Sequence, residues 1–342
     1  MNPESKGTTT PTQDIVIIGG GPVGLACAIA ARRASIPHLV IEKGCLVNSI
    51  FNFPVGMIFF TTPELMELGG HPLICSQEKP TRAEALAYYR AVSRVEELRI
   101  NLFEKVTGVR GEKDSFEILT ENREGAGSYP CRRIILATGY YDNPNRMGIP
   151  GEDLPHVSHY YAEAHPFLGR RVLVVGGKNS ACEAALDLFR QGAEVTITHR
   201  GAELGDGVKY WVRPDVENRI EAGEIRALFN TRVTAIEDRK VALETDGREA
   251  PLEEEYDQVF LLTGYHPDSA LMESCGLRPD PETLKPALDP ETLESADVPG
   301  IYLAGSVSAG YETGNIFIET GRFDCEKIFA SLQREPGTSG EA

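Results

Sequence analysis

Closely spaced cysteine pairs are missing from this sequence. Its seven cysteines are odd in number, and no two of them form a Cys-x-x-Cys pair. That spacing argues against a disulfide framework and against a zinc site. We therefore expect no metal and a reducing cytoplasm as the setting.

Long apolar runs and an excess of positive charge are also absent. No run of about 18 or more apolar residues is long enough to span a bilayer, and the N-terminal MNPESKGTTTPTQ lacks the features of a secretory signal. The 34 basic residues stand against 51 acidic ones, and the net charge of −17 repels nucleic-acid phosphates. We expect no membrane span, no nucleic-acid partner, and flexible polar tails at 1–12 and 335–342.

What the sequence does contain is an internal repeat. Residues 17–32 read IIGGGPVGLACAIAAR, and residues 174–189 read VVGGKNSACEAALDLF. Each stretch is an apolar strand, a small-residue turn and a helical pattern, followed by a second strand at 38–43 or 193–200. Because such β-α-β units join parallel strands by a right-handed crossover, the repeat predicts two similar domains.

The remaining strands complete both halves. Antiparallel strands follow each unit, joined in the first half by a polar turn at NREGAGSYP, and each half closes on a strand that ends in Thr-Gly. One late strand, GIYLAG at 300–305, is expected to return to the first domain before a helix at 315–332. The predicted fold is α/β, with two Rossmann-like three-layer (ββα) dinucleotide-binding domains. The first domain is discontinuous, at 13–154 and 281–334, and the second, at 155–280, is inserted into it.

The first glycine turn fits the pattern G-x-G-x-x-G. Gly19 permits the tight turn, Gly21 lets a pyrophosphate approach the backbone, and Gly24 lets the helix pack on the strand. Glu42 ends the next strand, where a ribose diol needs a hydrogen-bond acceptor. A glycine-rich turn without a ligand is the alternative, but the preceding strand, the following helix and Glu42 together favour a dinucleotide.

The second turn departs from the pattern. Lys178 stands where the glycine nearest the pyrophosphate usually lies, and the next strand ends in His199 and Arg200 instead of an acid, with Lys209 in the loop beyond. Cations at this place suit a 2′-phosphate, which points to NADP. A surface ion pair for Arg200 and a packing role for His199 are the alternatives.

Two different dinucleotide sites on one chain predict two cofactors. Hydride transfer from a nicotinamide to a flavin unites them most simply, so we expect NADPH and FAD. Aromatic residues at 51–60 either line the flavin or fill the core. Tyr88 and Tyr89, on a predicted helix, are expected to be one core and one surface position.

The motifs together resemble a known family. The chain is similar to thioredoxin-reductase-like flavoproteins with two dinucleotide-binding domains. The motifs that carry the similarity are GGGPVG with Glu42, ATGYYDNP, VVGGKNSA with HR, LLTGYHPD and GIYLAG. The resemblance implies that residues 137–139 lie beside FAD, that the Val106 backbone meets the adenine, and that Gly305 and Ser306 approach the ribityl and pyrophosphate groups. In all, the predicted cofactor-binding residues are Gly19, Gly21, Pro22, Val23, Gly24, Glu42, Lys43, Asn48, Phe53, Val106, Ala137, Thr138, Gly139, Gly305, Ser306, Asn315, Ile316, Gly176, Gly177, Lys178, Asn179, Ser180, Ala181, His199, Arg200, Lys209, Gly264 and Tyr265.

Further stretches resemble the bacillithiol-disulfide-reductase-like (YpdA) branch of this family. They are VNSIFNFP, MIFFTTPELMELGG, KPTRAEALAYYRAV and VKYWVRPD. This resemblance implies a homodimeric enzyme that passes electrons from NADPH through FAD to a low-molecular-weight disulfide. The chain has no Cys-x-x-Cys, and Val23 stands where the branch has its proposed redox cysteine. Cys27 and Cys45 are the candidate replacements, although packing is the favoured role for both.

The electron acceptor stays open at this point. A small disulfide, a ferredoxin-type or other redox protein, and oxygen or a quinone all fit the sequence as acceptors. A flavin-bound redox sensor without turnover is the non-enzymatic alternative. The catalytic residues are unknown.

Overall fold

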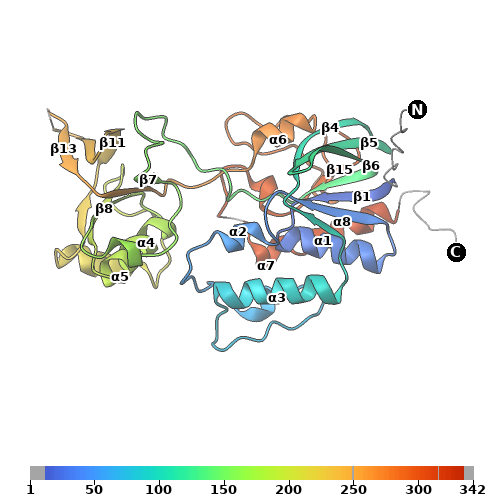
Figure 1. The fold of residues 1–342 in the computed structure, drawn as a ribbon, viewed down its shortest axis with the longest axis horizontal. Coiled ribbons are helices and arrows are strands. Elements are labelled where there is room, and N and C mark those ends of the chain that lie inside the picture. Colours follow the sequence, from blue (N-terminus) through green and yellow to red (C-terminus); the bar gives the residue numbers. More distant parts are fainter. Residues whose placement is uncertain (1–11, 249, 315, 335–342) are drawn as a thin grey trace, which may run out of the picture. The chain divides into compact units, whose positions relative to one another are not determined.

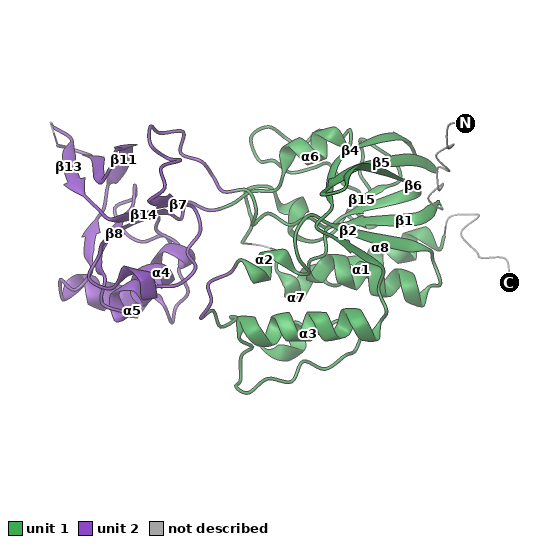
Figure 2. Cartoon of the chain, in the orientation of Figure 1, with its two compact units in different colours: residues 1–52, 57–143, 265–342 green, residues 53–56, 144–264 purple. Residues whose placement is uncertain are grey.

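The computed structural model describes residues 12–248, 250–314 and 316–334. Within it the chain divides into two compact units (Figure 2). Unit 1 takes residues up to 52, 57–143 and those from 265, and unit 2 takes 53–56 and 144–264. Apart from the short segment 53–56, the chain passes between units at 143–144 and 264–265. The domain limits expected from the sequence lie later in the chain in both places.

Unit 1 is built on a seven-stranded sheet with the path β3-β2-β1-β6-β5-β4, and β15 adds to it by pairing with β6 (Figure 1). The pairing places the late strand in the first sheet. Its elements are β1 (Gln13–Ile18), α1 (Pro22–Arg33), β2 (His38–Glu42), α2 (Asn48–Phe51), α3 (Arg82–Val95), β3 (Ile100–Leu102), β4 (Lys105–Glu112), β5 (Ser115–Asn122), β6 (Gly125–Leu136), α6 (Ser269–Ser274), β15 (Ile301–Leu303), α7 (Ile318–Gly321) and α8 (Asp324–Leu332), with short 3₁₀ turns at Pro63–Leu65 and Gly305–Ala309.

The side chains of β1 point alternately to the two faces of the sheet, and this alternation explains the layers of unit 1. Ile15 and Ile17 pack with α1 and α8 on one face, whereas Val16 and Ile18 pack with the apolar side chains of β4, β5 and α6 on the other. Figure 1 shows α1 and α8 together on one side of the sheet. The result is a helix layer, a parallel sheet and an antiparallel layer.

Two expectations about these elements are wrong in detail. In place of a long polar turn after β5, the strand β6 begins at Gly125 and pairs with β5 from Asn122 onward, so the turn is confined to residues 123–124. The predicted helix at 315–332 is two helices, α7 and α8, separated by residues 322–323. The break arises because the Phe323 N–H bonds to the Thr320 carbonyl, three residues back, and so leaves the α-helical hydrogen-bond pattern.

Unit 2 repeats the plan on a smaller scale. A five-stranded parallel sheet has the order β10-β9-β8-β14-β7, and a three-stranded antiparallel sheet covers one face of it. The helix α4 packs on the other face. The elements are β7 (Val157–Ser158), a 3₁₀ turn at His165–Phe167, β8 (Arg171–Val175), α4 (Asn179–Arg190), β9 (Glu194–Thr198), α5 (Arg213–Glu221), β10 (Arg226–Leu228), β11 (Thr231–Ile236), β12 (Lys240–Thr245), β13 (Leu252–Glu255) and β14 (Gln258–Leu261).

The segment between α2 and α3 is held against α3 by tyrosines. Tyr88 and Tyr89 are both buried, so the expected surface position is wrong. The Tyr88 hydroxyl accepts from the Leu68 N–H at 2.7 Å and donates to the His71 carbonyl at 2.8 Å. Because these bonds involve residues far apart in sequence, helical periodicity alone could not reveal them.

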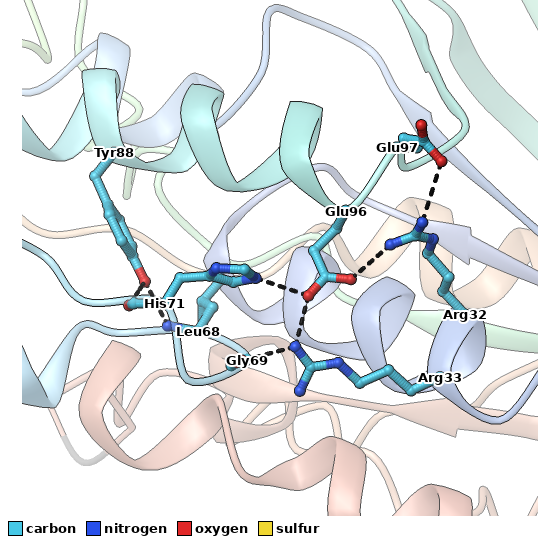
Figure 3. A network of polar contacts seen from close by, with 8 residues as sticks. All are labelled: Arg32, Arg33, Leu68, Gly69, His71, Tyr88, Glu96 and Glu97. Carbon is cyan, nitrogen blue, oxygen red and sulfur yellow. Dashed lines mark hydrogen bonds and ion pairs between the residues drawn. The ribbon is translucent and has the colours of Figure 1, made fainter.

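A buried carboxylate completes this attachment (Figure 3). The Glu96 carboxylate, just after α3, pairs with Arg32 at 2.9 Å and with Arg33 at 2.5 Å, both at the end of α1. It also contacts His71 at 2.7 Å, in the segment between α2 and α3. Burial alone would raise the pKa of Glu96, but the hydrogen bonds from His71, Arg33 and Arg32 lower it to about 2. Glu96 therefore joins three parts of unit 1 through one charge.

We expect Glu96→Gln to lower the free energy of unfolding by about 2 kcal/mol, because charged hydrogen bonds to two arginines are lost. Urea unfolding followed by circular dichroism measures it. The matched control is Glu97→Gln, whose side chain is 80% exposed and pairs with Arg32 alone, and which should cost less than about 0.5 kcal/mol. Since the folded pKa lies below the unfolded value of about 4.3, the loss should be full above about pH 5 and vanish as the pH falls toward 2. Equal losses for both variants would contradict this role.

Candidate functional site

The turn between β1 and α1 has room for a ligand at one glycine only. Gly19 has a φ of +112°, and a Cβ on it would overlap the Ala137 carbonyl oxygen. A Cβ on Gly24 would overlap the Gly19 oxygen in the same way. Around Gly21, in contrast, nothing lies within 4 Å of the place that a Cβ would take. Gly19 and Gly24 are therefore required by packing, and Gly21 leaves an open approach to the backbone.

The helix that follows supplies donors at this opening. Gly21 is the N-cap of α1, and no side chain caps the first turn. The N–H groups of a helix's first turn lack partners within the helix and favour an anion. An open backbone and uncapped donors together fit a pyrophosphate.

Glu42 closes the other side of the turn. Its carboxylate accepts from the Gly20 N–H and from the Gly44 N–H, each at 2.7 Å. Burial raises the pKa of Glu42, and these two bonds oppose the rise. Lys43 pairs instead with Asp142 at 3.0 Å. Each Glu42 oxygen keeps acceptor capacity beyond its backbone bond, so the residue fits the predicted ribose contact.

The end of β15 meets the same turn. Gly305, at a φ of +75°, lies so close to Val23 that a Cβ on it would be 3.0 Å from that side chain. Gly139, at a φ of +66°, faces the Ser306 hydroxyl, which is 3.8 Å from its Cβ position. The structure thus brings Val23, Gly305, Gly139 and Ser306 together with Gly19.

Sequence reasoning missed an acid here. Asp324, at the start of α8, accepts from the Gly305 N–H at 2.7 Å. Burial raises the pKa of Asp324, and the bond from Gly305 and the nearby Lys327 offset only part of the rise. The residue directly after Gly305 is Ser306, which carries no charge. The carboxylate at this turn comes from Asp324, which no local motif could indicate.

The other predicted residues have structural roles of their own, and their nucleotide contacts stay predictions. Asn48 packs against Gly44 and accepts from the Cys45 thiol at 3.6 Å, and Val106 is buried in the core of unit 1. The Tyr265 ring packs against the Tyr141 ring in unit 1, with centroids 4.7 Å apart and an interplanar angle of 40°. Pro22 is the first residue of α1, and Thr138 lies against Gly19. Phe53 and Gly264 belong to unit 2, Ile316 packs near Gly321, and Asn315 lies outside the described residues.

Neither candidate cysteine has the setting of a reactive thiolate. Cys27 is fully buried among apolar side chains, and burial raises its pKa well above the usual range. Cys45 is half-buried, and both burial and the nearby Glu42 raise its pKa. A reactive cysteine needs an electropositive, accessible position, so both residues fit packing roles better.

The second glycine turn repeats the backbone contacts of the first. In unit 1, the Gly19 N–H donates to Ile41 of the neighbouring strand at 2.9 Å; in unit 2, the Gly176 N–H donates to Thr198 at the same distance. Gly176 has a φ of +148°, and a Cβ on it would be 2.6 Å from the Leu262 carbonyl oxygen. The two turns are therefore equivalent in their backbone geometry.

Side chains make the second turn different. The His199 ring packs on Gly177, where a Cβ would come within 2.6 Å of it. Burial lowers the pKa of His199, and the nearby Arg200 and Lys178 lower it further. Arg200 and Lys178 are exposed, and within the described residues neither pairs with a carboxylate. Two cations without a carboxylate partner among the described residues therefore lie beside the turn.

The loop at 201–212 lies back over this turn. The Gly205 N–H donates to the Gly177 carbonyl at 2.8 Å. The Asn179 side chain accepts from the Lys209 N–H at 2.8 Å and donates to the Gly207 carbonyl at 3.0 Å. Asn179 therefore positions the loop, and its contact with a nucleotide stays a prediction, as do those of the exposed Ser180 and the buried Ala181.

Neither a metal centre nor a membrane span accompanies the two turns in the described part of the chain. Among residues 12–248, 250–314 and 316–334, no cluster of three His, Cys, Asp or Glu side chains is arranged to hold a metal ion. Over the same ranges, no helix has the length and apolar character for crossing a membrane.

Comparison with known proteins agrees with two nucleotide turns. Residues 16–305 match the family described as pyridine nucleotide-disulphide oxidoreductase. The chain is 41% identical to bacilliredoxin reductase Bdr of Bacillus subtilis over 320 residues, which cover 93% of this chain and 97% of the relative.

Solved structures match equally well. Bacillithiol disulfide reductase Bdr (YpdA) from Bacillus cereus has a TM-score of 0.91 and 41% identity, covering 95% of this chain and 100% of that chain. The protein of the same name from Staphylococcus aureus has a TM-score of 0.89 and 37% identity, with the same two coverages.

The open position at Gly21 leads to a prediction. We expect Gly21→Ala to fold normally, because its φ of −75° suits alanine and nothing is within 4 Å. The flavin bound per chain should fall below about half, because the new methyl group occupies the pyrophosphate approach. Visible absorbance at purification measures the flavin content. Gly56→Ala, which also has free space around it, is the control and should keep its full flavin content. An unchanged flavin content in Gly21→Ala would contradict the assignment of the pyrophosphate to this turn.

Proposed function

The chain belongs to the pyridine nucleotide-disulphide oxidoreductase family, as an oxidoreductase that uses FAD and NADPH, and from this premise we propose that it reduces a low-molecular-weight disulfide. The overall reaction consumes NADPH, a proton and one disulfide, and it yields NADP⁺ and two thiols. Support for a bacillithiol-type disulfide comes from the names of the two solved relatives, which match over nearly the whole chain.

The observation that carries the proposal is the presence of two equivalent glycine turns with opposite charges beside them. Glu42 lies beside the first turn, and Arg200 with Lys178 lies beside the second. A carboxylate suits a ribose diol, and cations suit a 2′-phosphate. We assign FAD to unit 1 and NADPH to unit 2 on this difference.

Residues of unit 1 would hold the flavin nucleotide. FAD, when bound, supplies the redox centre between NADPH and the disulfide. The α1 N-terminus would bind its pyrophosphate, Glu42 its adenosine ribose, and Ser306 with Gly305 its ribityl chain. Asp324 would keep the Gly305 turn in position through the bond to its N–H.

A thiol of the protein is not part of the proposed reaction. Val23 fills the space between Gly305 and Gly321, where the resemblance would place a cysteine. Cys27 and Cys45 lack a thiolate setting. Both thiols released in each turnover then come from the substrate disulfide itself.

The proposal includes a cytoplasmic setting and a homodimer. All seven cysteines are free, which supports a reducing compartment. The homodimer rests on the resemblance alone, and sedimentation of the purified protein would test it.

Anaerobic spectroscopy tests the function directly. NADPH should bleach the flavin absorbance of the purified protein, and bacillithiol disulfide should then restore it and sustain NADPH consumption. Ferredoxin and a disulfide-free control are run in parallel. A single bleaching without turnover on any disulfide would contradict a disulfide reductase and favour a sensor, whereas turnover with ferredoxin alone would favour the other acceptor class.

Arg200 should set the choice of nucleotide. We expect Arg200→Ala to lower kcat/KM for NADPH about 10- to 100-fold, because a charged contact to the 2′-phosphate is lost. The value for NADH should stay within about threefold, since NADH lacks that phosphate. Steady-state kinetics with both nucleotides measure the split. Arg239→Ala, an arginine of the same unit that pairs with Asp257 at 3.2 Å, is the control, and an equal loss with NADPH and NADH would argue against the assignment.

The cysteines should be dispensable. We expect Cys45→Ser and Cys27→Ser each to retain disulfide-dependent NADPH oxidation within about twofold, because neither thiol is activated. Rates are expressed per bound flavin, so that a folding defect is not mistaken for a chemical one. Cys27→Ala controls for the polarity of a buried hydroxyl. Complete loss in Cys45→Ser, or in both Cys27 variants, would identify that cysteine as a redox relay.

A further inference from the structure

The loop at 201–212 carries an exposed aromatic pair. Trp211, the one tryptophan of the sequence, is 42% exposed, and Tyr210 is 82% exposed. Their rings meet edge to face, with centroids 4.8 Å apart and an interplanar angle of 87°. The Lys209 ammonium lies 5.8 Å from the Trp211 ring centroid. Large aromatic rings gain little stability at the surface, so their exposure here suggests a ligand.

The pair stands on a firm support. Leu204, Val208 and Val212 from the same loop are buried in the core beside α4. Arg213 donates to the carbonyls of Leu204 and Gly205 at 3.2 and 2.7 Å. The backbone on both sides of Tyr210 and Trp211 is therefore held by packing and hydrogen bonds, and the two exposed rings have a well-supported position.

The support also places the pair beside the second glycine turn. The Lys209 N–H bonds to Asn179, the first residue of α4, and Gly205 bonds to Gly177 of the turn itself. Trp211 is two residues beyond Lys209. The aromatic pair therefore belongs to the same local structure as the turn, entirely within unit 2.

The cations beside the second glycine turn have no carboxylate partner in the described part of the chain. Arg190, Arg219 and Arg226 each pair with a carboxylate. Arg200 and Lys178 pair with none in the described part of the chain, and both lie near His199. A ligand that fits this neighbourhood needs an anionic group for the cations and a flat ring for the aromatic pair.

Adenosine with a 2′-phosphate has both features. Resting on the proposed function, we propose that Trp211, supported by Tyr210, is the stacking platform for the adenine ring of NADPH. A base stacks on an aromatic face without sequence-specific hydrogen bonds. Trp211 is thus a positioning residue for the nucleotide, and Arg200 contacts the phosphate that distinguishes NADPH from NADH.

Two ligands separate the base contact from the phosphate contact. Adenosine 2′,5′-bisphosphate carries both groups, and 5′-AMP lacks the 2′-phosphate. Calorimetry with the flavin-loaded protein should show Trp211→Leu binding both ligands about tenfold more weakly, because loss of stacking affects them equally. Arg200→Ala should weaken only the bisphosphate. Phe103→Leu, an exposed aromatic of unit 1, is the control and should change neither.

The wild-type protein offers a second readout that needs no mutation. Since Trp211 is the one tryptophan, its emission reports on the platform alone. Adenosine 2′,5′-bisphosphate absorbs too far in the ultraviolet to interfere, and it should change the emission and protect the ring from acrylamide. In steady-state assays, Trp211→Leu should raise KM for NADPH and leave kcat unchanged.

The outcomes are distinct. Unchanged affinity of Trp211→Leu for both ligands, with Arg200→Ala still weakening the bisphosphate, would overturn the platform and leave the nucleotide site standing. Unchanged emission and acrylamide quenching at saturating ligand would also overturn it. Failure of the wild-type protein to bind either ligand would overturn the platform and the proposed function together.

Discussion

The close approach of a neighbouring carbonyl to each glycine turn is the constraint on which the rest of this structure depends. In unit 1 the Ala137 carbonyl lies over Gly19, and in unit 2 the Leu262 carbonyl lies over Gly176. The residue pairs share their backbone bonds as well, since Ala137 and Leu262 each donate at 2.8 Å to the strand that leads into the turn. Only glycine fits at such a turn, and the chain then enters a helix whose first N–H groups point outward.

Because the two turns are equivalent in backbone, a difference in the ligands that they bind would come from their side chains. A buried carboxylate, Glu42, is tied to the first turn by two backbone N–H groups. The second turn has a packed His199, whose pKa is lowered, flanked by the cations Arg200 and Lys178. A chain with a net charge of −17 keeps these cations without carboxylate partners in its described part, which favours a phosphate at the second turn and a diol at the first.

Local patterns revealed the parts of this arrangement that depend on neighbours in sequence. The two β-α-β units, the glycine spacing and the place of Glu42 follow from periodicity and turn chemistry. Asp324 at the Gly305 turn and the burial of both Tyr88 and Tyr89 could not be predicted, because each depends on partners far along the chain. Asn179 is a similar case, since its side chain accepts a hydrogen bond from Lys209, in a loop about thirty residues later.

A crystal structure of the flavin-loaded protein with NADP⁺ tests the central claim most directly. Two nucleotides should be visible, one with its pyrophosphate at Gly21 and its ribose at Glu42, and the other with its pyrophosphate at Gly177 and its 2′-phosphate at Arg200. A structure with NADP⁺ bound away from the second turn, or with flavin bound away from the first, would contradict the account.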